Sequence, residues 1–231
     1  MAGLTDQAGG SRSSGKEMVD QAQQAWQESM LRRLEVLRSD LHARTPQEVA
    51  DKCGGTYEEH HIRFKYWDRT VVIAWTSLDA RYAEDGKPCS TFDIAMLIYY
   101  LHTADGAALA DRWIAFRELP SGGFYHQAFQ GYSGNLVARH FGNRPENFDA
   151  AALKLGGLCL TALAPHAYAF QPLPRIRLAA ALWPGDEDFT AHASILFDAG
   201  CDHYMTTDGL ALLGAGLSRR LIRTGERGSS T

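Results

Sequence analysis

The sequence lacks the long hydrophobic runs and paired cysteines that mark several large classes of protein. Its longest apolar candidate, residues 94–101, is far shorter than the roughly 20 residues that a membrane-spanning helix needs. The N-terminus has no apolar signal core, so we expect a cytoplasmic protein that does not enter a membrane. The four cysteines form no C-x-x-C pair, which argues against a disulfide framework or a metal site of four cysteines: Cys53, Cys89, Cys159 and Cys201.

Excess basic charge and phosphate-binding motifs are also missing. Lys and Arg number 23 against 27 Asp and Glu, and the formal net charge is -4. Since no basic stripe interleaves with aromatic residues, we expect no nucleic-acid partner. The sequence contains neither G-x-x-x-x-G-K-[ST] nor G-x-G-x-x-G, the loops that cradle phosphates in many nucleotide-binding proteins. What is present is 45% hydrophobic residues in a chain of 231, which can fill a sizeable core.

Composition divides the chain into four segments. Residues 1–15 and 225–231 are predicted to be disordered tails, because they have too few apolar side chains to order themselves. Residues 16–44 are predicted as an N-terminal amphipathic helix and residues 45–224 as a single domain. Over residues 16–42 this helix carries an apolar stripe that should pack on the body or on a protein partner: Trp26, Met30, Leu34, Leu37 and Leu41.

The body of the chain interleaves helices with pairs of strands. A capping box at residues 45–48 should start one helix, with glycine after Cys53 ending it. Residues 62–75 have the alternation of a hairpin, residues 112–119 that of a further strand, and residues 207–223 the pattern of a terminal helix. Because the closest strand pairs are hairpins, we expect an α+β fold with a mainly antiparallel sheet packed with helices.

Residues 173–198 form a second predicted hairpin around an acidic turn. One face of each strand is apolar and should meet the core: Ile176, Leu178, Ala180 and Leu182, with Ala191, Ala193, Ile195 and Phe197. If Trp183 pairs with Thr190, Arg175 lies opposite Asp198 as a cross-strand ion pair.

The other face of this hairpin has two interpretations. Arg177 and His192 could reach an anionic or polar ligand that lies on this face. Cross-strand pairing explains the same residues without any ligand.

The turn of the hairpin gathers carboxylates beside two aromatic residues, Trp183 and Phe189. Asp186, Glu187 and Asp188 could hold a hard cation through oxygen ligands. The spacing is not that of a calcium loop, however, and such a run is more often a solvated turn in which the first aspartate bonds its own backbone. We therefore predict no metal site and keep Trp183, Asp186 and Glu187 as candidate ligand-binding residues.

A glycine pair follows the strand predicted at residues 112–119. Free N–H groups at Gly122 and Gly123, next to Arg117, could hold an anion at the start of a helix. The simpler interpretation is a tight strand-to-helix turn that requires glycine. Tyr125 directly follows this turn and completes the candidate group.

Four motifs together resemble a family known only as a domain of unknown function, DUF3786. They are RWIAFRELPSGGFY at 112–125, LPRI at 173–176, LWPGDEDF at 182–189 and ILFD at 195–198. The resemblance covers about residues 46–213, with Asp188 where the family usually has glutamate and Arg177 where it usually has proline. Some members carry a cysteine-rich iron–sulfur segment that this chain lacks, so this association transfers weakly and the cofactor stays unknown.

Three functions remain open from the sequence. The first is an accessory or ligand-binding domain that takes a small anionic molecule or cofactor at the glycine turn and the hairpin loop. The second is an enzyme that uses carboxylate and histidine chemistry, with Glu118, Asp186, Glu187 and His192 gathered in one pocket. The third is a structural protein-interaction module, in which the motifs are signatures of turns and packing.

Overall fold

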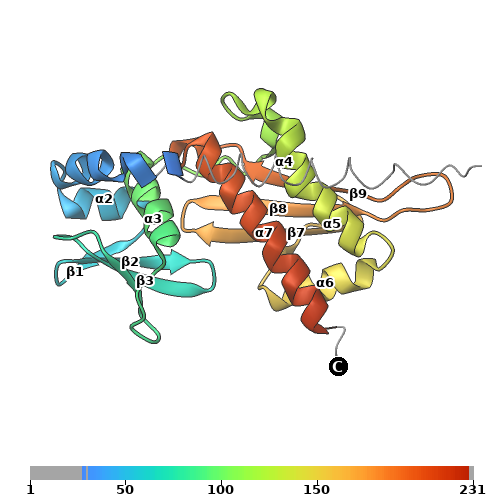
Figure 1. Ribbon diagram of the computed structural model, residues 1–231, viewed down its shortest axis with the longest axis horizontal. Helices are drawn as coiled ribbons and strands as arrows, with labels where there is room; N and C mark the ends of the chain where they lie inside the picture. Colours follow the sequence, from blue (N-terminus) through green and yellow to red (C-terminus); the bar gives the residue numbers. More distant parts are fainter. Residues whose placement is uncertain (1–27, 30, 229–231) are drawn as a thin grey trace, which may run out of the picture.

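The fold consists of two antiparallel sheets with helices packed around them (Figure 1). The computed structural model describes residues 28, 29 and 31–228. Its two sheets and interleaved helices confirm the predicted α+β class, although the strands divide between two sheets. Among the described residues, no helix combines the length and apolar character needed to cross a bilayer.

The first sheet has four strands and is formed by the N-terminal part of the domain. Its strands lie in chain order and are β1 (Thr56–Glu58), β2 (His61–Tyr66), β3 (Arg69–Ala74) and β4 (Ala80–Tyr82). Helices α2 (Pro46–Cys53) and α3 (Thr91–Thr103) accompany it. Helix α3 is buried almost all round because its residues 95–101 are apolar or aromatic, as its sequence predicts.

The second sheet has five strands in the order β5-β9-β8-β7-β6. Its long central strand β8 (Ile176–Trp183) lies between β9 (His192–Asp198) and β7 (His166–Leu173). The edge strands are short, β5 (Trp113–Ala115) on one side and β6 (Leu158–Cys159) on the other.

The remaining helices pack on the five-stranded sheet. They are α4 (His126–Tyr132), α5 (Gly134–Phe141), α6 (Pro145–Lys154) and α7 (Thr207–Gly228), with short 3-10 turns at Phe116–Glu118, Gly122–Phe124 and Cys201–His203. Helix α7 crosses the sheet diagonally and continues past the expected end at Arg223 (Figure 1). Its last turns therefore include part of the segment expected to be a tail.

A single cluster of buried side chains connects the two sheets. It runs from Leu34 in the N-terminal helix through both sheets to Leu221 in α7. The turn between β2 and β3 also docks on the second sheet, because the Trp67 N–H donates to the Pro172 carbonyl at 2.7 Å. This junction places the first hairpin beside α7.

The described part of the N-terminal helix, residues 28–29 and 31–42, packs on the domain itself. Leu34, Leu37 and Leu41 are buried in the main cluster, and His42 meets Trp75 edge to face. The side chain of Val36 remains 63% exposed. The other two residues of the predicted stripe, Trp26 and Met30, lie outside the described residues, and a protein partner for this helix stays a prediction.

Two local predictions need correction. The strand predicted at residues 112–119 ends at Ala115, because the Glu118 side chain accepts the Ala115 N–H at 2.7 Å and closes a 3-10 turn. Helix α2 begins at Pro46 and has a left-handed Gly54 cap as expected, but Thr45 makes no side-chain cap. Glu48 instead pairs with Lys52 at 2.7 Å.

The register of the 173–198 hairpin differs from the expected one. Trp183 pairs with His192 rather than with Thr190, which brings Arg177 instead of Arg175 opposite Asp198. The predicted core faces of the two strands are buried on the same side of the sheet, because the shift moves the pairing by an even number of residues.

Candidate anion-binding pocket

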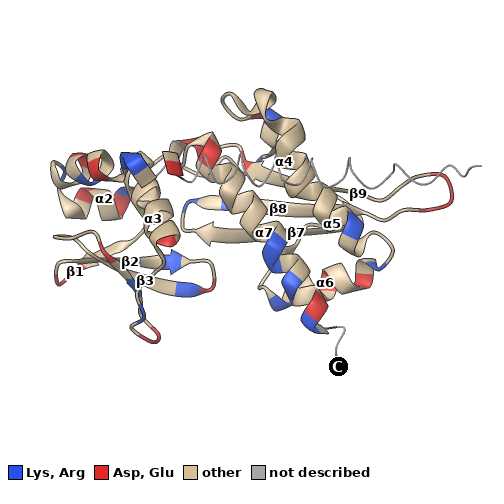
Figure 2. Ribbon diagram, viewed as in Figure 1, with Lys and Arg blue, Asp and Glu red and all other residues tan. Residues whose placement is uncertain are grey.

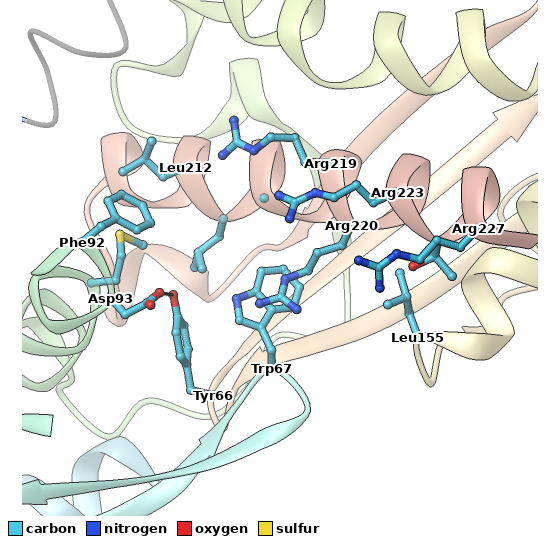
Figure 3. Close-up of a pocket in the computed structure, with 14 residues that line it drawn as sticks. Tyr66, Trp67, Phe92, Asp93, Leu155, Leu212, Arg219, Arg220, Arg223 and Arg227 are labelled. Carbon is cyan, nitrogen blue, oxygen red and sulfur yellow. Dashed lines mark hydrogen bonds between the residues drawn. The ribbon is translucent and has the colours of Figure 1, made fainter. Parts of the chain in front are cut away.

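A pocket of about 360 Å³ lies between α7, the first turn of α3 and the β2–β3 hairpin (Figure 3). Helix α7 supplies four arginines to it, and the opposite side is formed by aromatic and acidic residues of the N-terminal half. The principal lining residues are Tyr66, Trp67, Asp93, Arg219, Arg220, Arg223 and Arg227. We call this cavity the arginine pocket.

Helical spacing brings the four arginines together. Arg219, Arg223 and Arg227 follow one another at intervals of four residues, with Arg220 beside them, so they share one side of α7. Figure 2 shows this concentration of basic residues in the C-terminal half of the helix. Like charges four residues apart destabilise a helix by about 0.2–0.5 kcal/mol per pair, so the stripe has a cost in stability.

Arg219 is the arginine whose charge is least compensated. Its side chain is half-buried, and in the described part of the chain no carboxylate lies in ion-pairing distance of it. Burial, and next the positive charge of Arg223, lowers the pKa of the Arg219 guanidinium from its ordinary value. An anion in the pocket would relieve both effects at once.

Arg220 is held differently from its neighbours. Its guanidinium lies 4.4 Å from the centroid of the Trp67 ring, and it approaches the Asp68 carboxylate at 3.7 Å near the surface. Stacking on an aromatic ring fixes the orientation of a guanidinium group. Arg220 is therefore preorganised in the pocket before any ligand arrives.

Trp67 is positioned by a constrained turn. It occupies the two-residue loop between β2 and β3 with φ of 57°, a left-handed conformation that is uncommon for a bulky residue. The hydrogen bond from its N–H to Pro172 fixes this turn on the second sheet. Backbone strain of this kind persists where surrounding contacts hold it and is frequent at binding sites.

Asp93 forms the acidic end of the pocket and is surrounded by hydroxyl donors. It accepts hydrogen bonds from Tyr66 at 3.0 Å, Tyr82 at 3.3 Å and Ser90 at 2.7 Å. Burial, followed by the nearby Asp93 charge, raises the pKa of Tyr66 well above its ordinary value, so this hydroxyl stays protonated as a donor. These contacts engage the Asp93 carboxylate away from the four arginines (Figure 3).

The pocket thus combines four guanidinium groups with one carboxylate and several apolar side chains. Guanidinium groups bind phosphates and carboxylates through paired N–H donors, and several in one cavity can surround a group with more than one negative charge. The described residues that line the pocket include no histidine, cysteine or serine, and its hydroxyl groups are those of Tyr66 and Thr224.

Arg177 is bound within the fold by two aspartates. Its guanidinium bonds Asp198 at 2.7 Å and also contacts Asp111. Asp198 is 1% exposed and accepts the N–H groups of Ala110 and Gly200 at 2.9 and 3.0 Å. This network closes the end of the hairpin opposite the acidic turn.

His192 and Trp183 lie at the far end of the same strands from Arg177. Their rings pack 5.5 Å apart as cross-strand partners, and His192 contacts the Ser194 hydroxyl at 3.1 Å. The structure therefore separates Arg177 from His192 along the length of β8, and one small ligand does not span both.

The acidic turn, residues 185–191, borders a broad, open hollow of about 1010 Å³ that α5 and the end of α4 line on the other side. Asp186 and Glu187 line it, whereas Glu118 and His192 are not among its lining residues. Asp186 accepts the N–H groups of Asp188 and Phe189 at 2.9 and 2.7 Å, which is the self-bonded turn expected from the sequence. Over the described residues, no cluster of three or more metal-binding side chains occurs.

The glycine turn is tightly packed. A Cβ on Gly122 would lie 2.0 Å from the Phe116 carbonyl oxygen, whereas Gly123 has space around it. The Gly122 N–H already bonds Leu119 within the turn. Arg117 and Tyr125 are both exposed beside it, so these sequence-predicted residues lie together on the surface.

The arginine pocket is absent from the sequence-based predictions, although one signal for it was present. Arginines at positions 219, 223 and 227 have the period of a single helix face. Trp67 and Asp93 could not be assigned to the same site, because they reach it through contacts between distant segments.

Comparison with protein families matches residues 45–220 to DUF3786, described as a domain of unknown function. This range includes Trp67, Asp93, Arg219 and Arg220 and ends before Arg223. Searches of curated proteins and of solved structures found no significant match. The match covers well over half of the chain and contains the motifs singled out in the sequence, so this protein belongs to the DUF3786 family.

Proposed function

We propose that the protein is a ligand-binding domain that takes a small anionic molecule in the arginine pocket. One observation carries the proposal: four arginines of α7, at positions 219, 220, 223 and 227, line one cavity, and no described carboxylate lies in ion-pairing distance of Arg219. A cluster of like charges is unfavourable in the empty pocket and becomes favourable once an anion enters.

The position of the stripe along α7 supports binding over a purely structural role. Cations in the last turn of a helix interact favourably with its dipole, which explains Arg227 without any ligand. Arg219 lies more than two turns before the end at Gly228, where the dipole effect has faded. Its half-buried charge needs another reason, and an anionic ligand provides one.

The dimensions of the pocket fit a small molecule. Its volume of about 360 Å³ lies in the lower part of the range for small-molecule sites, roughly 300–1,000 Å³. Arg220 is held by Trp67, and the Asp93 carboxylate by its three hydroxyl partners, so both ends are largely formed in advance. Preformed groups lose little conformational entropy on binding, which favours affinity for a matching ligand.

Isothermal titration calorimetry with inorganic pyrophosphate tests the proposal on the full chain. We expect the wild-type protein to bind, and Arg223→Gln to weaken binding by about tenfold or more, because a charge-assisted hydrogen bond is lost. Arg223 is exposed, so this substitution should leave the fold intact.

Arg117→Gln provides the matched control. Arg117 is equally exposed but belongs to the glycine turn outside the pocket, so its loss should leave pyrophosphate affinity unchanged. Equal weakening by both variants would indicate unspecific charge attraction and contradict a site in the arginine pocket.

A further inference from the structure

A second hollow of about 450 Å³ adjoins the arginine pocket. The two cavities share three lining residues: Trp67, Leu155 and Arg220. Since Trp67 and Arg220 stack on each other, this pair forms the common wall between the cavities. A ligand bound at the arginines thus has a neighbouring space into which it can extend.

The second hollow differs chemically from the first. Its lining includes three apolar residues, Leu155, Phe170 and Leu217, together with Trp67 and the carboxylate of Asp68. Lys154 and Gln171 are both exposed and lie at its rim. Planar, weakly polar groups are favoured in such a space because they remove apolar surface from water.

Trp67 is the central residue of this common wall. The Trp67 ring is held on one side by Arg220, and a Cβ on Gly216 of α7 would lie 3.5 Å from its Cζ2 atom. This distance is an ordinary van der Waals contact, so the indole packs closely against this turn of α7. Trp67 therefore contributes to both cavities at once, next to the cationic groups.

We propose that the ligand joins a phosphate or carboxylate group to a planar aromatic ring, as a mononucleotide does. This inference rests on the proposed function, since it assigns the anionic group to Arg219, Arg223 and Arg227. The ring occupies the second hollow against Trp67 and Phe170. Because the two cavities lie on either side of Trp67, a molecule with both an anionic group and an aromatic ring binds more tightly than a molecule with only one of them.

Adenosine 5′-monophosphate and ribose 5-phosphate form a matched pair of probes, because they differ by the adenine ring. In calorimetric titrations of the full chain, we expect the wild-type protein to bind the nucleotide about tenfold more tightly, the contribution of one stacked base. Trp67→Ala should reduce this ratio to near one, whereas Trp67→Phe retains an aromatic ring and should keep most of it. Arg223→Gln should weaken both probes alike.

The outcomes separate this inference from the proposed function. Binding of both probes with equal affinity would overturn the two-part ligand and leave anion binding intact. Failure of both probes and of pyrophosphate to bind would overturn the proposed function itself. If Trp67→Ala does not fold, Gln171→Trp narrows the second hollow from its rim and should weaken the nucleotide alone; an unchanged ratio in that variant would contradict the inference.

Discussion

The guanidinium of Arg220 stacks on the indole of Trp67 with 4.4 Å between the guanidinium carbon and the ring centroid. This contact joins the last helix of the chain to the first hairpin of the four-stranded sheet. It also fixes one of the four cationic groups of the arginine pocket at a defined place. We therefore expect Arg219 and Arg220, which are neighbours on α7, to have opposite effects on the free energy of unfolding.

Substitution of two adjacent arginines should change stability in opposite directions. Arg219→Met removes a half-buried charge that repels Arg223 and should raise the free energy of unfolding by about 0.5 kcal/mol in the absence of ligand. Arg220→Met removes the stacking on Trp67 and should lower it by about 0.5–1 kcal/mol. Urea denaturation of both variants gives the comparison.

A loss of stability in Arg219→Met as large as that in Arg220→Met would contradict this account. It would mean that Arg219 makes a favourable interaction in the folded protein. A gain in stability in Arg219→Met is the result expected if Arg219 serves the proposed anion site, because binding sites are commonly less stable than they could be.

The Arg177–Asp198 pair is predicted to be important for stability. Asp198→Asn should lower the free energy of unfolding by about 3–5 kcal/mol, because it leaves Arg177 and several N–H groups around Asp198 without their charged acceptor. Asp111→Asn removes the other carboxylate that contacts Arg177, but Asp111 is 79% exposed. We expect less than about 1 kcal/mol there.

Chemical denaturation at neutral pH distinguishes these two carboxylates. Similar losses in both variants would show that burial does not set the strength of the two ion pairs. The comparison is matched because both substitutions replace an aspartate that bonds the same Arg177 nitrogen.

The same pair predicts a dependence of stability on acid. Burial alone would raise the pKa of Asp198, but the N–H groups of Gly200 and Ala110 and the Arg177 charge together lower it from the ordinary value of 3.8. A carboxyl with a lowered pKa contributes stability above its unfolded pKa, and that stability is lost as pH falls through the folded pKa. Thermal unfolding between pH 5 and about pH 2 should show a steep loss that is shallower in Asp198→Asn. An identical slope in the wild-type protein and this variant would assign the acid sensitivity to other carboxyls.

A substitution in the glycine turn tests whether Gly122 is needed for close packing or for binding an anion. Gly122→Ala should destabilise the protein strongly, since the added Cβ would overlap the Phe116 carbonyl. Gly131→Ala lies in α4, where an added Cβ meets nothing within 4 Å, and should be neutral or stabilising by up to about 1 kcal/mol. Melting temperatures measure both effects, and a tolerated Gly122→Ala would show that this glycine serves another purpose.

Patterns local to the chain predicted much of the fold. The Gly54 cap of α2 and the apolar face of β8 depend on a few adjacent residues, and both are confirmed, although Ala179 and Ala181 on the other face of β8 are buried as well. The strand predicted at 112–119 failed because Glu118 closes a 3-10 turn with the Ala115 N–H, a side-chain contact that alternation does not encode. The hairpin register failed because the turn after Trp183 is longer than the assumed pairing requires.

The candidate site was less accessible to prediction. The sequence-based candidates were the 182–189 turn and the glycine pair, because their distinctive motifs are contiguous and determine the local turn geometry. The arginine pocket instead combines an ordinary helical stripe with Trp67 and Asp93 from another sheet and helix. Such a combination depends on tertiary packing, which periodicity and spacing do not supply.

The most direct test of the central claim is to observe the arginine side chains while pyrophosphate is added. Arginine Nε–H signals in nuclear magnetic resonance spectra report on each guanidinium group, and Arg117 and Arg177 serve as internal references outside the pocket. We predict saturable shifts of the signals of Arg219, Arg220, Arg223 and Arg227, with Arg117 and Arg177 unaffected. Unchanged signals from the α7 arginines, or equal shifts at all six, would contradict an anion site in the arginine pocket.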